Sequence, residues 1–167
     1  MKYQRKAFTM IELIFVIVIL GILSSVAISK MAVTRDDAVL VKGRAQVAGI
    51  RNAIVLMRNT NMLQAMGAKW PSALDDATTA VGQELFDGND TLGTLLDYPL
   101  YAKNSSGNWM KTATGYNFKV MNTDVPFVYG GSSGVTVDAK TYKAGQFDCN
   151  HNDPDANKQK YCKALTE

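Results

Sequence analysis

Histidine and cysteine are scarce in this sequence of 167 residues, which has one histidine, His151, and two cysteines, Cys149 and Cys162. A single histidine leaves no pairing signal for a serine–histidine hydrolytic site. Two cysteines and one histidine also fall one ligand short of the four that a structural zinc site needs. Because the sequence holds no catalytic constellation, we expect a protein that is not an enzyme.

Proline is absent from the first seventy residues, since the first one is Pro71. A helix that starts near the N-terminus is therefore not interrupted by a residue that lacks an N–H group. Apolar residues repeat at helical spacing in the second part of this stretch, at Val33, Leu40, Val47, Ile50, Ile54 and Met57. This stripe predicts a helix that continues to about residue 66 and needs a covering domain, with Gly67 and Pro71 ending it.

The net charge is low, and its excess lies at one end of the chain. The formal net charge is +3, and Lys2, Arg5 and Lys6 account for all of it, so the remainder is neutral. Net charge therefore gives no reason to expect a nucleic-acid surface. Further basic residues lie along the predicted helix, at Arg35, Lys42, Arg44, Arg51 and Arg58. We interpret them as a solvated helix face, in preference to a nucleic-acid face.

The sequence does have a long apolar run, residues 8–29, which reads FTMIELIFVIVILGILSSVAIS. A helix of this length measures about 33 Å at 1.5 Å per residue, close to the hydrocarbon thickness of a bilayer. The run is longer than the apolar part of a cleaved secretory signal, and no A-x-A site closes it. It is therefore predicted to span the membrane and to be kept.

One ionisable side chain, Glu12, lies within the apolar run. The isoleucine, leucine, valine and phenylalanine residues together favour insertion by about 4–8 kcal/mol, against a cost of about 3 kcal/mol for one central acid. The segment should therefore insert with Glu12 in place. A carboxylate in such a segment indicates a functional site. The alternative is a lone glutamate at the lipid interface of an ordinary single-span protein.

Basic residues flank both ends of the span, so they do not decide its orientation. The two cysteines do, because a disulfide needs an oxidising compartment and both cysteines follow the span. We therefore expect a cytoplasmic N-terminus. Two separate thiols are the alternative to the disulfide.

Residues 67–167 are predicted to form one small domain that opens with a connector, 67–105. Ser72 followed by Asp75 resembles a capping box with aspartate in place of glutamate, and it predicts a short helix there. Alternation of apolar and polar residues then predicts three or four antiparallel strands, at 109–111, 116–120, 126–129 and 135–138.

The predicted sheet needs a cover on its apolar face, and the helix stripe supplies one. Trp109, Tyr116 and Phe118 are accordingly expected in the core and not in a ligand cage. The fold class is α+β, with a long N-terminal helix packed on a small C-terminal antiparallel sheet. Its predicted parts are residues 1–7, a membrane half of the helix at 8–29, an amphipathic half at 30–66, and the domain at 67–167.

The residues before and within the apolar run, Lys6-Ala7-Phe8-Thr9-Met10-Ile11-Glu12-Leu13, resemble the class III signal of type IV pilins and type II secretion pseudopilins. The resemblance implies a leader, 1–7, that is cut between Ala7 and Phe8, followed by N-methylation of Phe8. It also implies that Glu12 is the glutamate with which this family assembles. The chain departs from the family in having Ala7 where glycine is usual, and in lacking a proline near Ser29.

The resemblance implies a structural function, as a subunit of a type II secretion pseudopilus that supports protein export. Two alternatives stay open: a subunit of a type IV or DNA-uptake pilus, and a single-span periplasmic binding domain that does not polymerise. The implied partners are other pilin or pseudopilin subunits, prepilin peptidase, an inner-membrane platform with its ATPase, and lipid before assembly. Nucleic acid is expected only for a DNA-uptake pilus. The implied location is the inner membrane, with a periplasmic domain, and then the filament.

The C-terminal segment resembles that of many type IV pilins, in which a disulfide closes the last loop, here between Cys149 and Cys162. Oxygen-bearing side chains between these cysteines raise the question of calcium, as some pseudopilins bind it in this region. Asp148, Asp153 and Asp155 are the weak candidates. The glycine of a calcium loop is missing and Gln159 stands where the bidentate glutamate belongs, so we favour turn-forming residues and no cofactor.

Overall fold

The computed structural model describes residues 8–65, 67–88 and 93–167, and it describes residues 28–34 by their backbone alone. The chain divides into two compact units, Met1–Asp37 and Ala38–Glu167. Helix α1, Met10–Leu63, supplies all the secondary structure described in the first unit and continues as the first element of the second.

In the first unit, α1 has no cover. Every residue from 8 to 27 is exposed, including Phe8 at 82% and Ile22 at 63%. The segment Met10–Ala27 is long and apolar enough to cross a membrane. Since burying apolar surface is the main favourable term in folding, this segment depends on lipid or on other protein chains for its cover.

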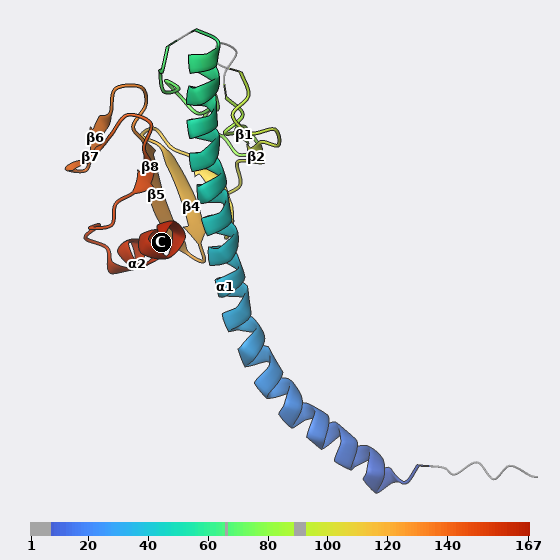
Figure 1. The fold of residues 1–167 in the computed structure, drawn as a ribbon. Helices are drawn as coiled ribbons and strands as arrows, with labels where there is room; N and C mark the ends of the chain where they lie inside the picture. The colour runs from blue at the N-terminus through green and yellow to red at the C-terminus, as the bar shows by residue number, and fades with distance from the viewer. Residues whose placement is uncertain (1–7, 66, 89–92) are drawn as a thin grey trace, which may run out of the picture. The chain divides into compact units, whose positions relative to one another are not determined.

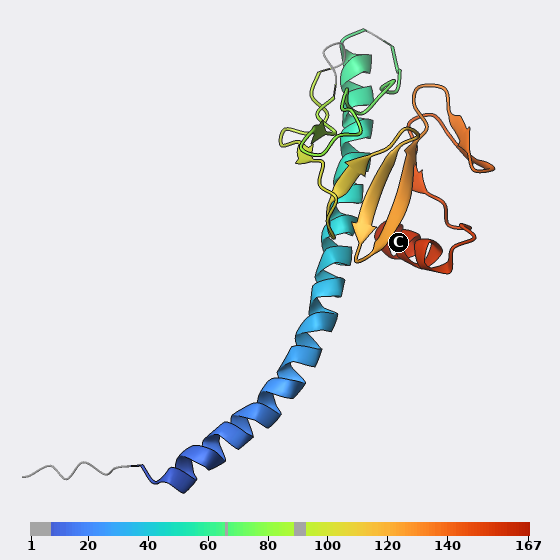
Figure 2. The ribbon, with the colours of Figure 1, turned by 180° about the vertical axis from the view of Figure 1, so that it is seen from behind.

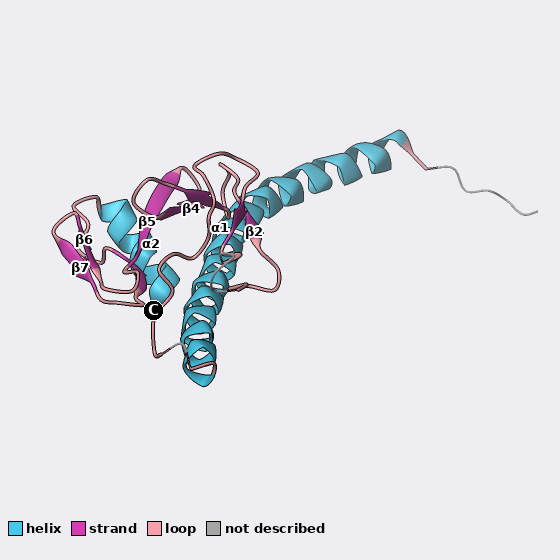
Figure 3. Cartoon of the chain, turned by 90° about the horizontal axis from the view of Figure 1, so that it is seen from above, coloured by secondary structure: helices cyan, strands magenta, loops and turns pink. Residues whose placement is uncertain are grey.

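The second unit is built on one antiparallel sheet with helices against it (Figures 1 and 2). Among the residues described, its elements after α1 are β1 (Glu84–Leu85), β2 (Leu100–Tyr101), β3 (Trp109–Lys111), β4 (Tyr116–Val120), β5 (Thr123–Tyr129), β6 (Val135–Val137), β7 (Lys140–Tyr142), β8 (Phe147–Cys149) and α2 (Ala156–Thr166). The main sheet has the order β3-β4-β5-β8. The pairs β1-β2 and β6-β7 form separate two-stranded ribbons, and Figure 3 shows the β6-β7 ribbon apart from the main sheet.

The register of the sheet places its large apolar side chains on one face. Trp109 lies opposite Phe118, which lies opposite Val125, and directly paired residues share a face. All three are buried, at 1% exposure or less. They pack in one core with the α1 residues Val47, Ile50, Ile54 and Met57. The predicted α+β class and the predicted cover of the sheet by the helix stripe are therefore confirmed.

Several local predictions were wrong. No helix follows Ser72 among the residues described, where the Asp75 carboxylate accepts from the N–H of Ala77 in a local turn and also pairs with the distant Lys111. Strand β6 pairs with β7 and not with the main sheet. The fourth strand of the main sheet is instead β8, which pairs with β5. The C-terminal segment that was expected to be a loop contains α2.

The basic residues of α1 are not merely a solvated face. Arg44, Arg51 and Arg58, spaced by seven, each donate to a backbone carbonyl of a different segment, on Ala164, Phe147 and Ala68, with nitrogen–oxygen distances from 2.6 to 3.4 Å. Lys42 donates to the carbonyl of Gly107 at 2.7 Å. Hydrogen bonds from charged donors are stronger than neutral ones, so this row fastens α1 to the rest of its unit.

Two neighbouring side chains approach α1 closely at Gly43. A Cβ atom placed there would lie 2.5 Å from both Cδ2 of Leu165 in α2 and Cε1 of Phe118 in β4. A Cβ at Gly49, two turns further on, would meet no atom within 4 Å. Both glycines are helical, so the difference between them comes from packing.

We therefore expect Gly43→Val to lower the free energy of unfolding by about 1–3 kcal/mol through overpacking. The matched variant Gly49→Ala is expected to raise it by about 0.5–1 kcal/mol, because alanine is the better helix former. Urea unfolding in mild detergent, followed by tryptophan fluorescence, measures both, since Trp70 and Trp109 lie in the second unit. Equal effects of the two variants would contradict the close approach.

Candidate functional site

Glu12 lies in the first turn of α1. Its backbone N–H donates to the carbonyl of Thr9 at 3.1 Å and approaches the Thr9 hydroxyl at 3.4 Å. Thr9-x-x-Glu12 is the sequence pattern of a helix capping box, in which the threonine side chain binds the third backbone N–H of the helix. The signal is present in the sequence, and the sequence analysis missed it.

The carboxylate of Glu12 has no ion pair or hydrogen bond within the described part of the chain, and its neighbours are apolar and exposed. Ile11 is 75% exposed and Leu13 is 59% exposed. An unpaired charge among apolar groups that need a cover is costly once that cover excludes water. Phe8 is exposed as well, while Ala7 and the rest of the predicted leader lie outside the described residues.

At the other end of the chain, a disulfide joins Cys149 in β8 to Cys162 in α2, with the two Cα atoms 5.8 Å apart. Both cysteines are buried in the core. Asp155 caps the start of α2, because its carboxylate accepts from the backbone N–H groups of Asn157 and Lys158. The disulfide thus holds a capped helix against the edge strand of the sheet.

The three calcium candidates have other partners in the structure. Asp148 forms ion pairs with Arg51 at 2.9 Å and Lys140 at 3.2 Å. Burial alone would raise the pKa of Asp148, but the ammonium of Lys140 and a backbone N–H hold it below its ordinary value. Asp153 accepts from the N–H of Asp155, which is itself the α2 cap. A carboxylate held between two cations does not suit a Ca²⁺ site, which needs several free oxygen ligands.

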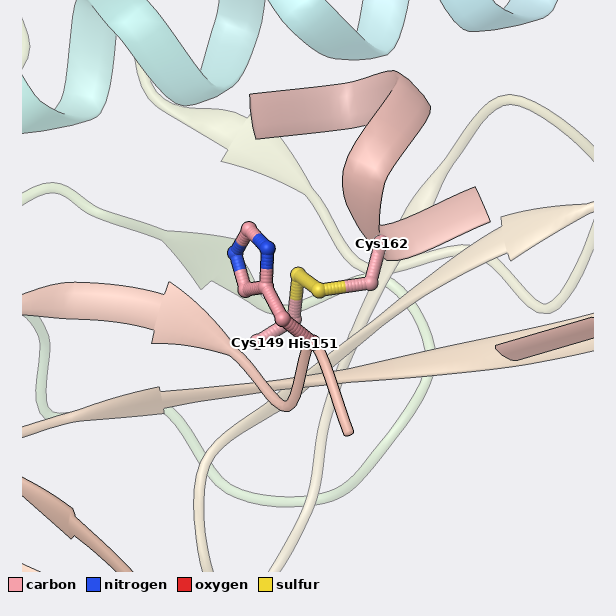
Figure 4. Close-up of side chains that lie close together, drawn as sticks. All are labelled: Cys149, His151 and Cys162. Atoms are coloured by element: carbon pink, nitrogen blue, oxygen red, sulfur yellow. A yellow bond between two sulfur atoms is a disulfide. The ribbon is translucent and has the colours of Figure 1, made fainter. Parts of the chain in front are cut away.

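His151 lies beside the disulfide (Figure 4). One ligand atom each from Cys149, His151 and Cys162 fall within 4.8 Å of one another. The two sulfur atoms are bonded to each other, however, and metal binding by cysteine requires free thiolates. Nε2 of His151 instead lies 3.3 Å from both Oδ1 of Asp148 and Oγ1 of Thr166. The histidine therefore belongs to the contact between β8 and the end of α2.

A buried ion pair that the sequence did not reveal ties the connector to the sheet. Oδ1 of Asp75, whose side chain is fully buried, lies 2.7 Å from Nζ of Lys111 in β3. Its other oxygen accepts from the Tyr116 hydroxyl at 2.8 Å and the Phe86 N–H at 2.9 Å. Burial and the adjacent carboxylate raise the pKa of Tyr116 far above its ordinary value, so the hydroxyl stays a donor.

Removal of the disulfide is expected to destabilise the second unit. Cys149 and Cys162 are 13 positions apart, and closing a loop of this size contributes roughly 3 kcal/mol in the chain-entropy model. We therefore expect the double variant Cys149→Ser/Cys162→Ser to unfold at lower urea concentration. Reductant should shift the wild-type curve to the same midpoint and leave the variant unchanged. A wild-type midpoint that is insensitive to reductant would contradict the expectation.

These features define a class of protein: a globular α+β domain carried on a helix whose first part is apolar, uncovered and marked by one acid. Residues 2–28 match the model of the prokaryotic N-terminal methylation motif. The chain thus has the N-terminal segment of a type IV pilin-like protein, a class that includes pseudopilins, and it fits a membrane-anchored pilin. Searches of curated proteins and of solved structures each found no match.

Proposed function

We propose that the chain is a filament subunit of a type II secretion pseudopilus and that its role is structural, without catalysis or a cofactor. The observation that carries the proposal is the uncovered apolar segment Met10–Ala27 with one unpaired acid at its start. The match of residues 2–28 to the methylation motif supports the proposal, in which cleavage creates a new N-terminus near that acid. An apolar surface of this kind suits both a bilayer before assembly and a bundle of like helices after it.

The pairing of opposite charges explains how copies would choose one arrangement. Cleavage between Ala7 and Phe8 leaves a positive amine at the start of an apolar helix. The carboxylate of Glu12 on a neighbouring copy offers the opposite charge. Either charge alone is costly in lipid, so their pairing favours docking and sets the axial register, as buried polar groups do in coiled coils.

The proposed life cycle has two stages. The precursor spans the inner membrane once, with a cytoplasmic N-terminus and a periplasmic second unit, where Cys149 and Cys162 can oxidise. Prepilin peptidase then removes residues 1–7 and methylates Phe8. An inner-membrane platform and its ATPase drive the subunits into the filament, where they contact other pilins or pseudopilins.

A second candidate function is a subunit of a type IV or DNA-uptake pilus. The disulfide that holds α2 against β8 favours it, because many type IV pilins close their C-terminal segment in this way. Nucleic acid would be a partner in the DNA-uptake case alone.

Mass spectrometry of the N-terminal peptide, combined with analysis of sheared filaments, tests the proposal. We expect a peptide that begins at N-methylated Phe8 and a chain that occurs in short periplasmic filaments. Loss of secreted proteins on deletion of the gene supports the pseudopilus, and long extracellular fibres support the pilus. An intact leader in cells with active prepilin peptidase, on a chain that stays monomeric, would contradict both and support an anchored binding domain.

A further inference from the structure

Three side chains that can bind a metal ion meet at the junction of β8, the loop after it and α2, and the disulfide uses only two of them. The Sγ atoms of Cys149 and Cys162 and a ring nitrogen of His151 all lie within 4.8 Å of one another. Figure 4 shows the imidazole beside the two sulfur atoms. The chain has no other histidine and no other cysteine, so all its imidazole and thiol groups are gathered at this one junction.

The spacing of these atoms is close to that of ligands around one zinc ion. Sulfur and nitrogen ligands bound at about 2.0–2.3 Å in a tetrahedral site lie roughly 3–4 Å from one another. The Cα atoms of the two cysteines are 5.8 Å apart, and the backbone already places both sulfur atoms beside the imidazole. Once the sulfur–sulfur bond is broken, small side-chain rotations therefore bring all three groups to the separation that a shared zinc ion needs.

The surroundings of His151 suit a metal ligand. A histidine that binds a metal ordinarily donates its other ring N–H to a carboxylate or a carbonyl, which fixes the orientation of the ring. Nε2 of His151 lies 3.3 Å from Oδ1 of Asp148, and Nδ1 lies 3.6 Å from Oε1 of Glu167. Whichever nitrogen binds the ion, a carboxylate is therefore beside the other. The ammonium of Lys140, which donates to the carbonyl of Cys149, also favours the thiolate form of that cysteine.

The junction is open to solvent on the side of the histidine. Cys149 and Cys162 are 0% and 1% exposed, whereas the side chain of His151 is 30% exposed. His151 lines a hollow of about 530 Å³ together with residues that include Lys140 and Asn150. A metal ion has an entry path from this hollow, and water can fill the fourth ligand position that three protein ligands leave open.

We infer that reduction of the disulfide converts this junction into a Zn²⁺ site, with the thiolates of Cys149 and Cys162 and the imidazole of His151 as its protein ligands. A dithiol reductant gives two electrons and two protons to the disulfide and is itself oxidised to a disulfide. Each thiol then loses its proton to water as its sulfur binds the ion, so two thiolates balance the charge of Zn²⁺.

The bound ion and the disulfide are thus alternative fastenings of α2 to β8. The reduced state arises in every copy of the chain, because a chain is made with free thiols and a disulfide forms only in an oxidising compartment. The inference goes beyond the proposed function and does not depend on it, since all three ligands lie in the second unit and bind whether or not the chain assembles.

The test uses the full chain in mild detergent, reduced with a phosphine so that no competing thiol is present, and titrated with Co²⁺ as a spectroscopic probe and then with Zn²⁺. We expect Co²⁺ to give the visible absorption of a tetrahedral thiolate site and Zn²⁺ to remove it. His151→Gln, which keeps a hydrogen-bond donor for Asp148, should lower the affinity for Zn²⁺ at least about tenfold, because mutating even the partners of a metal-bound histidine costs about 10–100-fold. The matched variant Asn152→Ala, in the same loop, should bind as the wild type does.

Urea unfolding, followed by tryptophan fluorescence, distinguishes a folded site from capture of the ion by the thiols of an unfolded chain. A ligand that binds only the folded state stabilises it, so Zn²⁺ should raise the urea midpoint of the reduced wild type and leave that of Cys149→Ser/Cys162→Ser unchanged. The oxidised form of His151→Gln shows by the same fluorescence that the variant folds.

Three results would each overturn the inference: no cobalt–thiolate absorption in the reduced wild type, equal Zn²⁺ affinity of the wild type and His151→Gln, or a midpoint that Zn²⁺ does not raise. None of them bears on the proposed function, which N-terminal processing and filament assembly test separately.

Discussion

The variant Glu12→Leu is expected to be cut after Ala7 as the wild type is, and to be missing from filaments. Leucine fits the apolar segment and removes the cost of an acid in the membrane, so insertion and access to the peptidase are kept. Without the carboxylate, the amine of Phe8 on a neighbouring copy has no partner when the helices close around it. Mass spectrometry of the membrane fraction measures cleavage, and immunoblotting of sheared filaments measures assembly.

The capping pattern at Thr9 provides the controls. Glu12→Gln keeps a side chain that suits a capping box but removes the charge, so it should fail to assemble in the same way as leucine. Thr9→Ala removes the cap and keeps the charge, and it should assemble with at most a modest loss. If Glu12→Gln assembled normally while Thr9→Ala did not, residue 12 would act by capping the start of the helix and not by its charge. The pairing of charges would then be wrong.

The variant Lys111→Met is expected to lower the free energy of unfolding of the second unit by about 3–5 kcal/mol, because it leaves a buried carboxylate without its cation. Asp75 is fully buried and Lys111 is 19% exposed at the side chain, with their charged atoms 2.7 Å apart. Against a denaturant slope of about 1–3 kcal/mol per molar urea, such a loss moves the unfolding midpoint by more than about 1 M. Tryptophan fluorescence follows the transition, since both tryptophans lie in this unit.

The double variant Asp75→Asn/Lys111→Met is the matched control. An amide at position 75 still has an oxygen for the Tyr116 hydroxyl or the Phe86 N–H, but it carries no charge into the core. It should therefore be more stable than Lys111→Met alone, and the coupling between the two sites should show in a double-mutant cycle. The cycle also needs the single variant Asp75→Asn. If the double variant lost as much free energy of unfolding as the two single variants added together, the ion pair would contribute little.

The N-terminal half of the chain was largely predictable because its signals are local. Hydrophobic run length indicates a membrane span, heptad-like spacing predicts the buried stripe, and the Lys6–Leu13 motif predicts the family. α1 was predicted over residues 8–66 and is observed at Met10–Leu63, a difference at the ends alone. Glu12 was identified as the acid of interest from the sequence, although its place beside the Thr9 cap was not.

The connector and the C-terminal segment were predicted less well, because their local signals have two meanings. Asp75 follows Ser72 at a spacing that suits a helix cap, yet its carboxylate is used by Lys111, 36 positions along the chain. Asp155 was considered as a calcium ligand, yet it caps α2. An aspartate accepts hydrogen bonds in any of these settings, and the donor that reaches it depends on which segments fold together.

The sequence alone determined what depends on neighbours along the chain: the apolar span, the processing motif, the continuous helix and its buried stripe, and the α+β class. The tertiary structure decided which distant groups meet: Asp75 with Lys111, Arg51 with the edge strand β8, and Gly43 with Leu165 and Phe118. The physical reason is the separation along the chain over which each kind of interaction acts. Periodicity and hydropathy act over a few residues, whereas ion pairs and close packing form between segments that only the folded core brings together.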